Sequence, residues 1–276
     1  MSTIIAYTGN KQALPIMKEI IGTQLYKGAA DYGIYVMNQN RIELFEGKVE
    51  NIDDLGKLNS LLNLRGSQSL CYLQRTKNNA EHLKGGEIMG HYHDKGLALI
   101  FNGSVSNKGE LIEFLASRGY DSHEMAEADI LARLINENLN SGDYDLKDSI
   151  STALSLVEGE YALVAMATTD PRSLVAAMSN KPLGVGSSAT DYLVSNQSRA
   201  LLDQTKNVTY LNNNELAYLN AEKEMSIQAI EKLNNGVNKL ENNNLKQTEM
   251  ENYMENSQEK EKQGFDYVDE GYMRHV

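Results

Sequence analysis

The chain has 276 residues, of which 41% are hydrophobic, so it can bury one substantial core and we expect one domain with an appendage. Its formal net charge of −12 excludes nucleic acid and anionic membranes as expected partners, because both require a positive protein surface. No apolar run approaches the ~20 residues of a membrane-spanning helix, and no charged and then apolar leader precedes the first expected strand. We therefore expect a cytoplasmic protein.

The chain has a single cysteine, Cys71, which excludes an intramolecular disulfide framework. It lies in an apolar, strand-like run at residues 69–73. We expect a buried and unreactive thiol, which is the usual condition of a free cysteine in such surroundings.

The pattern of apolar residues predicts a layered domain. Short apolar or alternating runs bounded by Gly, Asn, Asp or Pro predict strands at residues 3–8, 32–37, 41–45, 97–101, 161–167, 173–178 and 191–195. Amphipathic spacing predicts helices at residues 13–21, from Ser106 or Asn107 to Ser117, at 124–139 and at 146–157. If Asn107 is the N-cap of the second helix, Glu110 completes a capping box. Groups of strands separated by amphipathic helices indicate an α+β fold.

The composition changes after residue 220, where the chain becomes rich in Asn, Glu and Lys. Ile227, Ile230 and Leu233 have the spacing of a short helix. Residues 241–263 have too few apolar side chains to pack, so they predict a solvated helix or a disordered linker. We therefore expect a domain at residues 1–220 and a polar tail at 221–276.

The opening residues 1–9 (MSTIIAYTG) resemble the start of the class II glutamine amidotransferases, Met-Cys-Gly-Ile-Val-Gly-Tyr-x-Gly. Further similarities follow at the family's spacing: ALPI at 13–16, YKG at 26–28, NG at 102–103, VEGEYAL at 157–163, KPL at 181–183, and a closing hairpin at 207–211 and 215–217. The resemblance is nearest to the glutaminase half of glucosamine-6-phosphate synthase. It implies the four-layer α/β/β/α sandwich of the N-terminal nucleophile hydrolases, and no cofactor.

The chain departs from the family where the family carries its chemistry. In the family, removal of Met exposes a Cys that is the nucleophile and whose free amine is the general base; Ser2 stands in its place here. The glutamine-binding run Gly-His-Thr-Arg-Trp-Ala-Thr-His-Gly aligns with residues 71–79, so Gln74 replaces the Arg, Arg75 the Trp and Asn78 the His. Loss of the charged Arg fork is worth ~1.5–3 kcal/mol of glutamine binding. Glu127 aligns with the Asp that holds the substrate ammonium and keeps its charge.

Asn102 and Gly103 allow two interpretations. Asn-Gly is most often the tight turn after a strand. In the family the pair supplies an oxyanion hole, from the Asn side-chain amide and the Gly backbone amide. His91 and His93 also face one side of a strand, but with no third ligand nearby in the sequence we expect no metal site. The segment resembles the family's His-Pro-His, which lies beside the glutamine site without metal.

Two classes of function remain open. The first is a degenerate glutaminase-like domain that binds a small amino acid or amide, or pairs with a synthase or isomerase subunit or with itself. It rests on the combined changes at Ser2, Gln74, Arg75 and Asn78. The second is a hydrolase of another amide, in which Ser2 attacks after removal of Met1 because its α-amine, with a reference pKa of about 7.7–8.0, is a usable base. Ser2 can also be only a small polar residue before a strand. An active glutamine amidotransferase comes third, and we do not expect this chain to make an amino sugar by itself.

Overall fold

A computed structural model of the chain describes residues 2–24, 28–51, 53–54, 56, 66–75, 89–94, 96–121, 125–142 and 144–232, without the side chains of Arg75 and Met89. The described residues belong to one compact unit, Met1–Lys232. The predicted polar tail beyond Lys232 lies outside the described residues. Within them, no helix has the length and apolar character needed to span a membrane.

The described residues form two sheets whose strands pair antiparallel. The first has the strand order β11 (Val208–Tyr210), β9 (Gly184–Ser187), β10 (Tyr192–Ser195), β1 (Thr3–Thr8), β4 (Gln68–Arg75), β2 (Ala30–Asn38), β3 (Arg41–Val49). The second has the order β13 (Ser226–Ala229), β12 (Glu215–Asn220), β8 (Ser173–Ser179), β7 (Gly159–Ala167), β6 (Leu97–Val105), β5 (Met89–His93).

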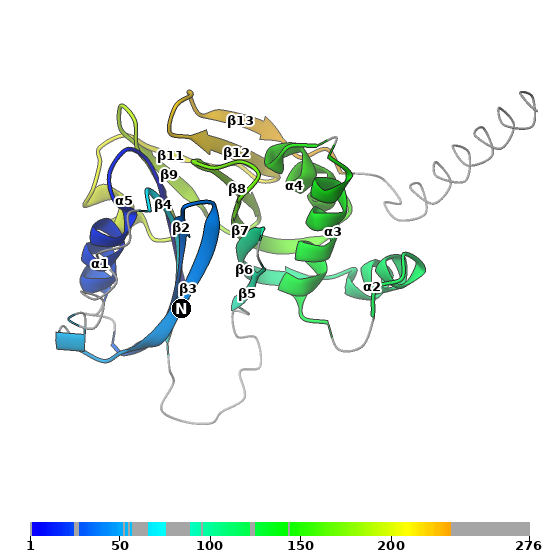
Figure 1. Cartoon of the computed structure of the whole chain (residues 1–276), viewed down its shortest axis with the longest axis horizontal. Helices are drawn as coiled ribbons and strands as arrows, with labels where there is room; N and C mark the ends of the chain where they lie inside the picture. Colours follow the sequence, from blue (N-terminus) through cyan, green and yellow to red (C-terminus); the bar gives the residue numbers. More distant parts are fainter. Residues whose placement is uncertain are drawn as a thin grey trace, which may run out of the picture. The chain divides into compact units, whose positions relative to one another are not determined.

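Helices cover the outer faces of both sheets (Figure 1). α1 (Ala13–Gln24) and α5 (Ser198–Leu202) pack on the first sheet, while α3 (Glu127–Ser141) and α4 (Leu146–Ser155) pack on the second, with α2 (Lys108–Ser117) against α3. The expected α+β, four-layer α/β/β/α sandwich is therefore confirmed.

Side-chain alternation along the central strands explains why they read as continuous apolar runs. In β1, Ile4 and Ala6 belong to the core between the sheets, whereas Ile5 and Tyr7 pack against the helix layer. Both faces of β1 are covered, so all six of its residues are buried. The same alternation in β4 sends Cys71 to the helix layer, where it is 0% exposed and burial raises the pKa of its thiol. The prediction of a buried cysteine is confirmed.

Several local predictions were wrong. Asn107 does not cap α2 with its side chain, which instead accepts a hydrogen bond from Glu158 N and donates one to Leu156 O. The predicted closing hairpin does not form, because β11 and β12 lie in different sheets. The segment containing Ile227 is not helical but forms strand β13, which pairs with β12, so the sheet continues past residue 220.

Candidate functional site

A row of four polar residues crosses one end of the first sheet on the face that looks toward the second sheet. The register pairs Asp31 with both Gln74 and Lys48. Because Thr3 pairs with Leu73, Ser2 lies next to Gln74, one residue beyond the last registered pair. All four residues share the parity of Ile4, Tyr72 and Tyr35, whose side chains pack between the sheets. We call Ser2, Gln74, Asp31 and Lys48 the first-sheet row.

A corresponding row crosses the second sheet. Asn102 pairs with Ala162, and Ala162 with Met178, and this row has the parity of the core residues Ile100 and Val164. We call Asn102, Ala162 and Met178 the second-sheet row. The alternation of side chains turns three of the predicted site residues toward the space between the sheets: Asn102 from the second sheet, and Gln74 and Ser2 from the first.

Contacts between the sheets show that these rows lie at the same end of the sandwich. At the opposite end, Thr8 Oγ1 donates to Arg172 O at 2.7 Å, and Gln68 donates to Ser173 O. Midway, the ring of Tyr72 stacks on His91 with centroids 4.6 Å apart. Gln74 lies two residues after Tyr72 on β4, and Asn102 lies two residues after Ile100, the partner of His91, on β6. The first-sheet row therefore lies opposite the second-sheet row, as expected for aligned sheets.

Asn196 fixes the position of Ser2. Its side-chain amide donates to Ser2 O at 3.0 Å, and its oxygen accepts from Ile4 N at 2.9 Å. Ser2 itself is only 4% exposed. The start of the chain is therefore held against the end of β10 by a side chain that the sequence analysis did not single out.

Asn102 lies in the interior of β6, so the interpretation of Asn-Gly as a turn is wrong. It is 2% exposed, and its Oδ1 accepts a hydrogen bond from Lys181 Nζ at 3.5 Å. In the described part of the chain its amide nitrogen Nδ2 has no hydrogen-bond partner. Nδ2 is not one of the fully buried unpaired side-chain atoms of the described residues, so this donor is open to water or to a ligand.

Gly103 follows with its own constraint and its own donor. A Cβ at this position would collide with the backbone oxygen of Glu160 and with Tyr161, so the close approach of β7 requires glycine. In the β6 ladder, Ser106 N bonds to Glu158 O on the β7 side, and Asp94 N bonds to Leu97 O on the β5 side. Antiparallel pairing alternates along a strand, so the N–H of Gly103 points to the β5 side.

Glu127, at the start of α3, lies along that same edge of β6. Its Oε1 accepts a hydrogen bond from Val105 N at 3.1 Å. Val105 is two residues beyond Gly103, about 7 Å along a strand, and its N–H points to the same side. The structure thus brings Glu127 beside Gly103, with its carboxylate engaged by the backbone.

Of the remaining predicted site residues, Gln74 is exposed at the end of β4. Arg75 ends the strand, but its side chain lies outside the described residues, as does the whole of Asn78.

A cluster of ring side chains and one carboxylate lies next to the two rows. Tyr72 donates to Glu46 Oε1 at 2.6 Å, and the hydroxyl of Tyr35 lies 2.5 Å from His91 Nδ1. Burial lowers the pKa of His91, and this effect outweighs the opposing charges of Glu46 and Asp129. The contact with Tyr35 engages Nδ1 of His91. Among the described residues, no group of three or more His, Cys, Asp or Glu side chains is placed to hold a metal ion.

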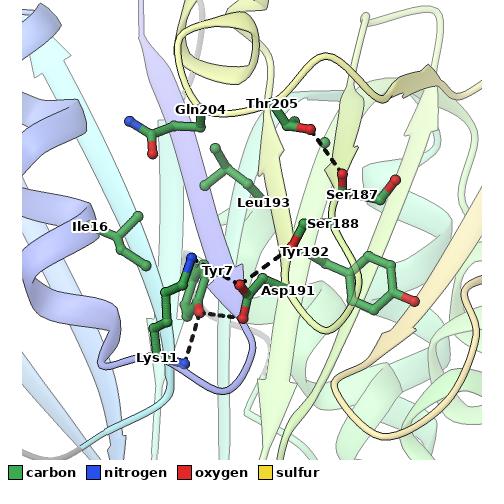
Figure 2. Close-up of a pocket in the computed structure, with 11 residues that line it drawn as sticks. Tyr7, Lys11, Ile16, Ser187, Ser188, Asp191, Tyr192, Leu193, Gln204 and Thr205 are labelled. Atoms are coloured by element: carbon green, nitrogen blue, oxygen red, sulfur yellow. Dashed lines mark hydrogen bonds and ion pairs between the residues drawn. The ribbon is translucent and has the colours of Figure 1, made fainter.

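A cavity lies elsewhere, at the other end of β1, and Figure 2 shows the side chains that line it. Asp191 accepts hydrogen bonds from Tyr7 Oη and Asn10 N, both at 2.9 Å, and pairs with Lys11 Nζ at 3.3 Å. Burial opposes ionisation of Asp191, but these hydrogen bonds outweigh it and hold its pKa below the ordinary value. The network fastens the end of β1 to the β9–β10 connection, and no predicted site residue lies in it.

No family model matches the chain. It is 28% identical to the glutamine–fructose-6-phosphate aminotransferase (isomerizing) of Clostridium tetani over 224 residues, which are 79% of this chain and 35% of that protein. It is 26% identical to the enzyme of that name from Helicobacter pylori over 258 residues, which are 92% of this chain and 42% of that protein. The chain therefore spans well under half the length of these curated relatives.

Solved structures share the fold. Glutamine phosphoribosylpyrophosphate amidotransferase from B. subtilis matches with a TM-score of 0.60 and 22% identity, over 83% of this chain and 49% of that one. A glutamine aminotransferase class-II domain protein from Silicibacter pomeroyi matches with a TM-score of 0.52 and 12% identity, over 83% of this chain and 99% of that one. The chain is thus a homologue of the glutamine–fructose-6-phosphate aminotransferases and has the N-terminal nucleophile fold of the class II glutamine amidotransferases.

Proposed function

We propose that this glutaminase-like domain binds a small amide or amino acid between Ser2 and Asn102 without hydrolysing glutamine, and acts as a binding or regulatory module. The observation that carries the proposal is that hydrogen-bond donors suited to a ligand are present while no cysteine thiol is placed to attack it. Asn102 Nδ2 and Gly103 N–H are donors of the kind that stabilise a tetrahedral oxyanion. The chain's one cysteine, Cys71, is fully buried on the other face of β4, so it cannot attack a ligand held there.

The first-sheet row supports binding weaker than, or different from, that of glutamine in the family. Gln74 stands where the resemblance implies an Arg that clamps the substrate carboxylate. A neutral amide replaces a charged, bidentate donor at that position. The substitution should lower glutamine affinity by about tenfold or more, since a charged hydrogen bond contributes about 1.5–3 kcal/mol.

A second candidate function is favoured by the placement of Ser2. Asn196 holds Ser2 in the row that faces Asn102, where a nucleophile would stand. A serine there attacks an amide only if its α-amine is free to take the hydroxyl proton, which requires removal of Met1. Intact mass spectrometry separates the two functions, because a retained Met1 blocks this mechanism.

The proposal is tested by ammonia release. We expect purified protein to release no ammonia from glutamine above the rate of a protein-free control. Turnover that disappears in Ser2→Ala would overturn the proposal and establish the hydrolase. A thermal-shift series with amino acids and amides tests the binding itself, since a ligand at 100 times its dissociation constant adds about 2.7 kcal/mol to the free energy of unfolding.

A further inference from the structure

Lys181 is a cation without a counter-ion beside the second-sheet row. It follows β8 and is half-buried, and its one contact among the described residues is Asn102 Oδ1. No carboxylate of the described chain lies within 4.0 Å of its ammonium group. This is unexpected in a chain with 38 acidic and 26 basic residues, where partners for a lysine are plentiful.

The backbone around Lys181 holds it in place. Asn180 adopts a positive φ of 54°, and its N–H donates to Asn213 Oδ1 at 2.8 Å. Pro182 restricts Lys181 to an extended backbone, and Leu183 is 1% exposed in the core. The fold therefore fixes the backbone position from which the Lys181 side chain reaches Asn102.

Lys181 joins two other donors for which the described residues show no acceptor. Nδ2 of Asn102 is unpartnered, and the N–H of Gly103 points out of the β6–β7 ladder. Because Lys181 already engages the oxygen of Asn102, the groups left to a ligand are all donors. A carboxylate satisfies such a set with two acceptor oxygens and a negative charge, whereas a carboxamide presents a donor of its own to it.

Carboxylates of the chain also lie near Lys181, Asn102 and Gly103, and they limit which ligands can bind there. Glu160 is exposed on the same face of the second sheet, but it forms no ion pair with Lys181. Asp31 lies in the first-sheet row opposite, and Glu127 is engaged by Val105 N. These negative charges favour a ligand whose second end carries an ammonium group.

Resting on the proposed function, we propose that Lys181, Asn102 and Gly103 form a subsite for the side-chain carboxylate of a small acidic amino acid, in preference to the isosteric amide. The domain then recognises the acid rather than the amide. Lys181 is the residue that makes the distinction, because it supplies the only full charge of the three donors.

The test compares L-glutamate with L-glutamine, which differ only at the side-chain end. Binding is followed by the NMR signal of the Asn102 side-chain amide, identified by its loss in Asn102→Ala. We expect glutamate to bind about tenfold more tightly than glutamine. We expect Lys181→Met to abolish the difference, Lys181→Arg to keep part of it, and Lys223→Met, which removes an exposed lysine from the other end of the second sheet, to leave it unchanged.

The outcomes separate the subsite from the proposed function. Equal or tighter binding of glutamine, or glutamate binding that is unaffected in folded Lys181→Met, overturns the subsite and leaves the binding module intact. An Asn102 signal that neither compound shifts overturns the subsite, and the absence of a thermal shift with every amino acid and amide of the series overturns the proposed function as well. Should Lys181→Met fail to fold, the comparison of the two compounds on the unmodified chain still decides.

Discussion

The two ends of β1 differ in how their polar groups are paired. At the C-terminal end, Tyr7, Asn10 and Lys11 converge on Asp191, and the carboxylate is saturated. At the N-terminal end, Asn102 and Lys181 share one weak contact and keep donors that no described residue accepts. A saturated network stabilises the fold and leaves no group for a ligand, whereas donors without a partner in the described protein remain available to water or to a ligand. The contrast therefore supports a structural role for the C-terminal end of β1 and agrees with the binding that we propose at the N-terminal end.

The largest effect is expected from breaking the saturated end with Asp191→Ala. Tyr7, which is 3% exposed, would keep its hydroxyl without an acceptor, and the N–H of Asn10 would lose its partner. We expect the free energy of unfolding to fall by about 3 kcal/mol, since the Tyr7 hydroxyl would become a buried unsatisfied donor, which costs about 1–3 kcal/mol, whereas the exposed N–H of Asn10 can turn to water. Urea denaturation measures the loss. A change below about 0.5 kcal/mol, the usual size of a surface substitution, would show that the network is not structural.

Gly103→Ala is expected to cost about 2 kcal/mol, because the new Cβ meets the backbone of Glu160 and the neighbouring strand must shift. Gly109→Ala is the matched control. Gly109 lies in α2 with nothing within 4 Å of a Cβ, so its substitution should leave stability unchanged or raise it by up to about 1 kcal/mol. Comparable stability of the two variants, measured by thermal melts, would show that β6 and β7 are not tightly packed. A loss of this size would mean that close packing against β7 is enough to explain Gly103, whereas packing does not explain the unpaired amide of Asn102.

His91, midway along the sheets, and Asp191, at the C-terminal end of β1, should contribute to stability in different pH ranges. His91 has a pKa below its ordinary 6.5, so its contribution is present above pH 6.5 and is lost as pH falls through the folded-state pKa. Asp191 has a pKa below its ordinary 3.8, so its contribution persists until the pH falls below 3.8 and is then lost. We expect His91→Phe to flatten the pH dependence of unfolding between about pH 7 and 5, and Asp191→Ala to flatten it only in stronger acid. A single shared range for both variants would contradict the assignment.

The sequence predicted the layers better than the site. The central strands β1, β7 and β8 could be predicted because both of their faces are covered. Such strands are continuous apolar runs, which are visible in the local sequence. The sequence left Asn102 and Gly103 open between a turn and an oxyanion hole because Asn-Gly is locally a turn signal, and only the approach of β7 shows why glycine stands there. Lys181 and Asn196 were missed because single polar residues after strands carry no periodic signal. Their roles follow from register and from the alignment of two sheets, which are properties of distant segments.

The smallest effect on stability is expected at the N-terminal end of β1, where Asn102 lies, and a comparison with a second asparagine tests it. Asn220, at the other end of the second sheet, is 6% exposed and fully engaged: its Nδ2 donates to Ser173 Oγ at 2.7 Å and its Oδ1 accepts from Glu222 N at 2.8 Å. Asn102 is 2% exposed, but its Nδ2 has no described partner. Both Asn→Ala changes remove the same atoms, so the cavity terms are similar and the difference reports hydrogen bonding.

We expect Asn220→Ala to lower the free energy of unfolding by about 2 kcal/mol and Asn102→Ala by about 0.5 kcal/mol or less, since only the second removes a donor that was unpaired. The same Asn102→Ala protein should lose the thermal shift produced by the amino acid or amide that the unmodified chain binds, while Asn220→Ala, once corrected for its lower midpoint, should keep it. Equal losses of stability would mean that Asn102 is held by the fold as firmly as Asn220. The unpaired donor would then be part of the core, and the two ends of β1 would no longer divide into structure and binding.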